Sequence, residues 1–144
     1  MLKLAPIVTR SLAFCLEDHL LMLQHGPIEP EDADWNRYVD AFRRELTDIQ
    51  AVLVSTEGPG PNTAQRKRLM DIAKDSPMRI PTVVLTPSRT ARGIVTALSW
   101  LGTAITAYAP DMLGTALTHL GVADARHRGV ADRLADLRRR LARN

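Results

Sequence analysis

Three short apolar runs, each followed by an amphipathic segment, constrain the fold more than any other feature of this chain. The runs are Ala51–Val54, Thr82–Thr86 and Ile105–Ala109. Each has the length of a buried strand, and the β-branched run Thr82–Thr86 is the clearest of the three. Strands that alternate with helices pair in parallel through right-handed crossovers, so the sequence predicts an α/β domain.

Two further apolar runs, Ser11–Leu16 and His19–Gln24, precede this repeat and are separated by Glu17 and Asp18. A two-residue break between apolar runs predicts a β-hairpin, and a single helix through both runs is the alternative. A hairpin adds an antiparallel element to the parallel strands. We therefore expect a mixed sheet.

The segments between the strands carry helix signals. A helix that opens at Pro30 has Asp32 and Asp34 in its first turn, where the helix dipole favours acidic side chains. Its apolar residues recur on one face, namely Trp35, Tyr38, Val39, Phe42 and Leu46.

Later helix starts are marked by capping residues. Asn62 with Gln65 three positions later resembles a capping box, and Ser88 is a suitable N-cap for the next helix. A further helix is expected from Pro110 and Asp111, so about four helices pack on the sheet.

The basic charge of the chain belongs to its C-terminal end. The 144 residues carry 19 Lys+Arg and 16 Asp+Glu, and the segment from Asp124 onward holds seven Arg and three Asp. Residues 1–123 therefore hold 12 basic and 13 acidic residues, which is no signature of a nucleic-acid partner. No apolar run has the length of a membrane span or of a secretory signal, so we expect one cytoplasmic domain.

Residues 124–144 are expected to form an Arg-rich amphipathic helix that follows a domain of residues 1–123. Its apolar stripe is Val130, Leu134, Leu137 and Leu141. The helix is expected to dock on the domain, and the alternatives are a homodimer or partner contact through the stripe, or contact with nucleic acid or acidic lipid.

The order of elements resembles the STAS domain, the fold of anti-sigma-factor antagonists, and the related CRAL-TRIO-like lipid-binding folds. The likeness covers about residues 12–122, and residues 60–66 and 92–100 are similar to segments of small bacterial STAS-like proteins. The resemblance implies a STAS-like mixed β-sheet with an N-terminal hairpin and a role in signalling through contact with a protein partner.

In the antagonist branch of that family, a Ser or Thr in an Asp-Ser-Ser/Thr-Gly loop is phosphorylated. The matching loop here, Ser55–Thr63, is longer, rich in proline, and lacks that tetrapeptide. No phosphoacceptor is therefore assigned.

Two loops should nevertheless form a binding rim, because ligands and partners meet α/β sheets beyond the carboxyl ends of their strands. These loops follow Val54 and Leu85. Their candidate binding residues for a partner or an anion are Ser55, Thr56, Asn62, Thr63, Ser88, Arg89 and Arg92. The alternative is structural: Asn62 and Ser88 only cap helices, and the arginines are solvated.

No residue pattern in the chain indicates catalysis, a metal or a cofactor. The histidines His19, His25, His119 and His127 lack metal-ligand spacing, and Gly58–Pro61 is no phosphate-binding loop because its prolines lack N–H groups. The single cysteine, Cys15, lies in an apolar run and is expected to be buried. We expect a non-catalytic regulatory or adaptor domain; a carrier of a small anionic or lipid-like ligand, or an enzyme of unfamiliar type, are the alternatives.

Overall fold

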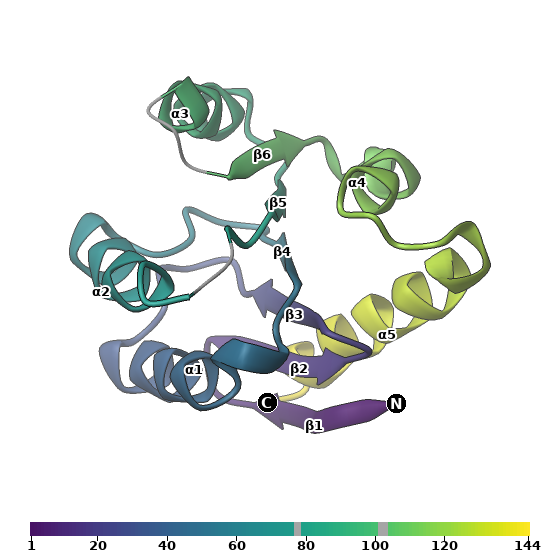
Figure 1. Cartoon of the computed structure of the whole chain (residues 1–144). Coiled ribbons are helices and arrows are strands. Elements are labelled where there is room, and N and C mark those ends of the chain that lie inside the picture. Colours follow the sequence, from purple (N-terminus) through teal and green to yellow (C-terminus); the bar gives the residue numbers. More distant parts are fainter. Residues whose placement is uncertain (77–78, 101–103) are drawn as a thin grey trace.

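Six strands of the described residues form one mixed sheet, in which every strand lies beside its neighbours in sequence (Figure 1). The computed structural model describes residues 1–76, 79–100 and 104–144. The strands are β1 (Leu2–Val8), β2 (Leu12–Glu17), β3 (Leu20–His25), β4 (Ala51–Ser55), β5 (Thr82–Leu85) and β6 (Ile105–Tyr108). β1, β2 and β3 are antiparallel, whereas β3 to β6 are parallel, which confirms the predicted α/β class with a mixed sheet.

The predicted N-terminal hairpin is formed by β2 and β3, and the single-helix alternative is wrong. The turn lies one residue later than the acidic break, at Asp18 and His19, which have positive φ values of 48° and 68°. Asp and His adopt this left-handed conformation more readily than most residues do. Glu17 is left in β2, where it pairs with Leu20.

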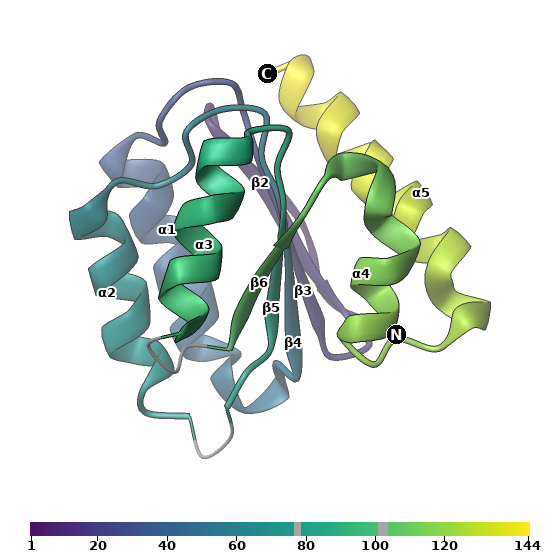
Figure 2. The same cartoon turned by 90° about the horizontal axis from the view of Figure 1, so that it is seen from above.

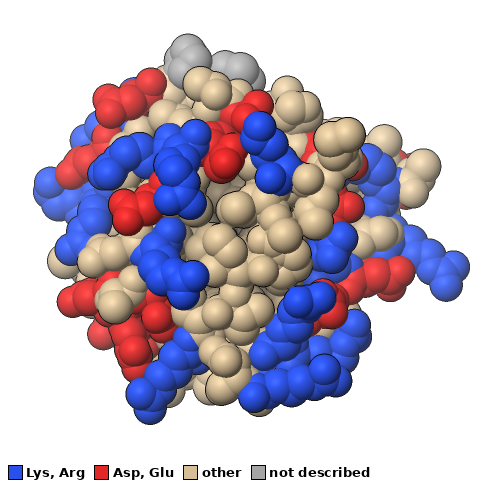
Figure 3. Space-filling view, turned by 90° about the horizontal axis from the view of Figure 1, so that it is seen from below, with Lys and Arg blue, Asp and Glu red and all other residues tan. Residues whose placement is uncertain are grey.

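The strand β1 was not predicted from the sequence. Its apolar pattern is interrupted by Lys3 and Pro6, and a proline is tolerated in a strand mainly at the edge of a sheet. β1 is such an edge, and its pairing with β2 is irregular between Leu2 and Ile7. Figure 3 views this edge, where a band of uncharged side chains lies between groups of charged ones.

In the described parts of the chain, five helices cover the two faces of the sheet (Figure 2). Three of them, α1 (Asp32–Arg44), α2 (Thr63–Ala73) and α3 (Arg89–Trp100), connect the parallel strands on one face. The other face carries α4 (Leu113–His119) and α5 (Asp124–Ala142). The helix expected from Pro110 begins instead as a short 3₁₀ turn, Pro110–Met112, which leads into α4.

The core on the α1 side is aromatic. Trp35, Tyr38 and Phe42 of α1 are buried against Phe14 of β2 and its neighbours, as the periodicity predicted. Asp34 does more than complement the helix dipole, because its carboxylate accepts hydrogen bonds from the backbone N–H and the hydroxyl of Ser11 at 3.0 and 2.6 Å. This contact ties the start of α1 to the start of β2.

The core on the opposite face is aliphatic and includes α5. Val130, Leu134 and Leu137 are buried in one cluster with residues of four strands, and Leu141 is partly buried beside it. The apolar stripe of the C-terminal helix is therefore occupied within the chain itself. In the described ranges no helix combines the length and the apolar character needed to cross a membrane.

Candidate functional site

The two loops of the predicted rim leave the sheet side by side. β4 pairs with β5 in parallel, and Ser55 lies opposite Leu85. The N–H of Thr56 donates to the carbonyl of Leu85 at 3.0 Å, and the N–H of Thr86 donates to the carbonyl of Tyr108 at 3.0 Å. Both loops therefore start at the edge where the parallel strands end, which we call the carboxyl edge.

The loop between β4 and α2 is held rigidly by its own polar groups. Thr56 bonds through its hydroxyl to the backbone of Gly58. A Cβ at Gly58 would overlap the carbonyl group of Pro27, so the close approach of these two loops requires glycine there. At the end of the loop, the side chains of Asn62 and Gln65 each accept the other's backbone N–H at 2.9 Å, which confirms the predicted capping box.

The loop between β5 and α3 is also internally bonded. The hydroxyl of Ser88 accepts the N–H of Ala91 at 3.1 Å, as expected of an N-cap. Arg92 donates from its guanidinium to the carbonyl of Thr86 at 2.7 Å. Arg92 was expected to point outward and bind a partner or an anion. In the structure it instead stabilises the loop that precedes α3.

The rim residues are therefore divided between structural and exposed positions. Ser55 and Thr56 are buried, whereas Thr63, Ser88 and Arg89 are exposed. Within the described part of the chain, no hydrogen bond or ion pair joins the side chains of residues 55–63 to Ser88, Arg89 or Arg92. The structure brings the two loops to one edge but does not bring all seven side chains into mutual contact.

Two arginines near the rim were missed from the sequence. Arg66 donates to the carbonyl of Pro61 at 2.8 Å and to the hydroxyl of Thr63 at 3.1 Å. Arg138 of α5 lies 3.7 Å from the carboxylate of Glu57, in an exposed ion pair. The position of Arg66 in the first turn after Asn62 could have indicated that it lies near the rim. The contact of Arg138 with Glu57 could not be predicted, because no local sequence pattern places α5 beside Glu57.

The buried end of β3 reaches the same edge. His25 stacks on Trp35 with ring centroids 6.0 Å apart, and burial lowers the pKa of His25 to about 4. Its Nδ1 and the Oε1 of Gln24 have no hydrogen-bond partner among the described residues. The imidazole is therefore neutral at pH 7 and lies inside the protein.

The structure also shows the surroundings of Cys15 and His119. Burial raises the pKa of the Cys15 thiol to about 11, so Cys15 is the buried, unreactive residue that was predicted. Thr106 and His119 approach to 3.4 Å, and no carboxylate in the described ranges contacts the other nitrogen of that ring. No group of His, Cys, Asp and Glu suited to a metal ion occurs in residues 1–76, 79–100 and 104–144.

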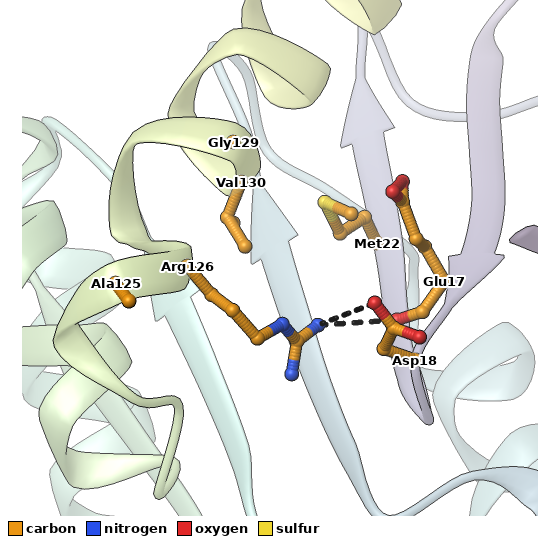
Figure 4. A pocket seen from close by; sticks show the side chains of 7 residues that line it. All are labelled: Glu17, Asp18, Met22, Ala125, Arg126, Gly129 and Val130. Carbon is orange, nitrogen blue, oxygen red and sulfur yellow. Dashed lines mark hydrogen bonds and ion pairs between the residues drawn. The ribbon is translucent and has the colours of Figure 1, made fainter. Parts of the chain in front are cut away.

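A cleft of about 250 Å³ lies at the opposite, amino edge of the sheet (Figure 4). The hairpin contributes Glu17, Asp18 and Met22 to it, and α5 contributes Ala125, Arg126, Gly129 and Val130. The guanidinium of Arg126 points toward the hairpin, 3.5 Å from the carbonyl of Glu17 and 3.9 Å from the carboxylate of Asp18. This cleft could not be predicted from local sequence patterns, because its two walls are more than 100 residues apart.

Comparisons of the chain with protein-family models, with curated proteins and with solved structures found no match. A fold of this class hosts many unrelated functions. The function must therefore be inferred from the side chains and loops themselves.

Proposed function

We propose that this chain is a non-catalytic, STAS-like adaptor domain of the cytoplasm that binds a protein partner at its carboxyl edge. Support comes from the element order, in which an antiparallel hairpin precedes three strand–helix units in one mixed sheet. The observation that carries the proposal is the pair of adjacent, internally bonded loops that follow β4 and β5.

These loops suit a protein partner because they need little rearrangement to bind. Asn62, Ser88 and Thr56 already satisfy backbone groups of their own loops. A surface that is ordered before binding loses less conformational entropy in the complex. Adaptor surfaces of this kind often change little between the free and bound states.

The charges of the rim favour an acidic partner surface. Arg89 is exposed and makes no hydrogen bond or ion pair with the residues that the structure describes. Arg66 is also exposed, and among the described residues it bonds to neutral oxygens alone, namely the carbonyl of Pro61 and the hydroxyl of Thr63. Guanidinium groups without a carboxylate partner bind acidic side chains well in two-point contacts.

The hollows around Asp18 and Arg126 lie at the amino edge of the sheet, so they do not belong to the proposed partner surface. A small ligand is usually held in a concave pocket that buries most of its surface.

Site-specific photo-crosslinking of the full chain in its native host tests the proposal. A crosslinking amino acid at position 89 should capture one partner, and the same group at position 128, on α5, should not capture it. With the partner purified, Arg89→Glu combined with Arg66→Glu should weaken binding at least about tenfold, and Arg128→Glu should leave it unchanged. The proposal fails if position 89 captures no specific protein, or if the double variant binds that protein as tightly as the wild type.

A further inference from the structure

The cleft beside the hairpin turn is bordered by small residues of α5. Ala125 and Gly129 lie on the cleft side of α5, and a Cβ added at Gly129 would have no atom within 4 Å. Glycine is the poorest helix former after proline, yet it stands inside this 19-residue helix. Together these small residues leave room between α5 and the hairpin.

The wall of the cleft formed by the hairpin is fixed by contacts on its far side. The carbonyl of His19 accepts the N–H of Gln50 at 2.9 Å, and its ring nitrogen Nδ1 contacts the carbonyl of Asp48 at 2.9 Å. The N–H of Asp18 donates to the carbonyl of Met1 at 3.0 Å. The hollow therefore lies against a turn that is anchored to two other segments.

Both carboxylates at the cleft already have cationic partners. Glu17 accepts a hydrogen bond from Arg133 at 3.0 Å, and Asp18 contacts the N-terminal ammonium group. The N-terminal contact lowers the pKa of Asp18, which keeps this carboxylate ionised. The hairpin side of the cleft thus presents charges that are offset by neighbouring groups.

Arg126 is the cation among the described residues that line the cleft, and both of its contacts with the hairpin are long. Only its Nη2 is engaged, at 3.5 and 3.9 Å, and its Nε and Nη1 make no hydrogen bond within that part of the chain. A second hollow of about 60 Å³ also borders Arg126 and Asp18, so open space lies beside this side chain in two places. A guanidinium in this state can bind a carboxylate through two nitrogens.

We propose that this cleft binds a small monocarboxylic acid, with its carboxylate on Arg126 and its apolar body beside Ala125 and Gly129, over the buried side chains of Met22 and Val130. The volume limits the ligand: about 250 Å³ corresponds to roughly eight water-sized groups at about 30 Å³ each. A straight-chain acid of about six carbons has that size. The site goes beyond the proposed partner contact and lies at the other edge of the sheet.

Hexanoate is the probe, with hexylamine and hexanol as matched compounds of opposite and zero charge. Titration of the ¹⁵N-labelled full chain should show saturable shifts at Met22, Arg126 and Gly129, and none at Thr63 or Arg89. For about eight non-hydrogen atoms we expect a Kd of about 1 mM for hexanoate, and weaker binding of the other two compounds.

Two variants separate the cleft from the rest of the helix. Gly129→Leu fills the cleft with a better helix former, so the fold should be kept and hexanoate binding lost. Arg126→Gln should weaken hexanoate at least about tenfold, and Arg128→Gln, on the same helix but outside the cleft, should not. Thermal unfolding of each variant checks that the fold is intact.

Three results would overturn the site. The first is the absence of saturable hexanoate binding at ten times the expected Kd. The second is hexanol or hexylamine binding as tightly as hexanoate, which would remove the role of Arg126. The third is hexanoate binding that persists in a folded Gly129→Leu protein. None of these results bears on the rim, because the crosslinking at position 89 does not involve the cleft.

Discussion

His25 combines full burial with an ionisable ring. It has 1% of its surface exposed, stacks on Trp35, and keeps Nδ1 without a hydrogen-bond partner among the described residues. Trp35 in turn donates from its indole N–H to the carbonyl of Gln65 at 2.9 Å, which joins α1 to α2. Protonation of His25 would therefore place an unsolvated charge between two packed helices, which is energetically costly.

Acidification should destabilise the protein through this histidine. The pKa of His25 falls from 6.5 to about 4 on folding, so between these values the unfolded chain binds the proton that the folded chain excludes. The free energy of unfolding should thus decrease as the pH falls from about 6.5 to about 4. Between pH 7.5 and 4.5 the loss from this group is on the order of 2–3 kcal/mol, measurable by urea unfolding.

The variant His25→Phe provides the comparison. It keeps an aromatic ring beside Trp35 and removes the titrating group, so the difference in stability between the two proteins should shift in favour of the variant at acid pH. Parallel stability curves for the two proteins over this range would show that His25 does not titrate as described.

At the scale of elements, sequence patterns predicted the helices and strands that are determined by residues close together in the chain. The strand β5 and the aromatic face of α1 follow from their β-branched run and their helical periodicity. β1 escaped prediction because Pro6 and Lys3 are compatible with a strand only at an edge, and the edge is a property of the whole sheet. The cleft and the ion pair of Glu57 with Arg138 were likewise inaccessible, because they depend on where α5 docks.

Gln65 makes both a local contact that could be predicted from the sequence and long-range contacts that could not. Its place three residues after Asn62 predicted the capping box. Its side chain also donates to the carbonyl of Pro30 and to the carboxylate of Asp32, both at 2.9 Å. Those contacts connect α2 to the start of α1 and could not be read from spacing along the chain.

Loss of the cap should destabilise α2 measurably. Asn62→Ala removes the acceptor for the N–H of Gln65, and we expect the free energy of unfolding to fall by about 1 kcal/mol. Thr63→Ala, at the next and exposed position, should change it by less than about 0.5 kcal/mol. Chemical denaturation of both variants is the measurement, and equal effects would mean that the capping box contributes little.

At the scale of the whole molecule, the sheet separates two cores and two candidate sites. The aromatic core supports α1 and α2, whose neighbouring loops form the carboxyl edge. The aliphatic core depends on α5, which covers β2 and β3 and forms one wall of the cleft. α5 also contacts the carboxyl edge through Arg138 and Glu57, so one helix borders both regions.

Because α5 completes the aliphatic core, residues 1–123 alone should not fold. Without α5, the strand residues that Val130, Leu134 and Leu137 cover would be exposed to water. In the full chain, Leu137→Ala should lower the free energy of unfolding by about 2–5 kcal/mol, since Leu137 is completely buried. Arg138→Ala, the next residue, loses only an exposed ion pair and should cost less than about 1 kcal/mol. Circular dichroism melting distinguishes these outcomes: a sharp, reversible transition of the 1–123 fragment would mean that the C-terminal helix is an appendage to a complete domain.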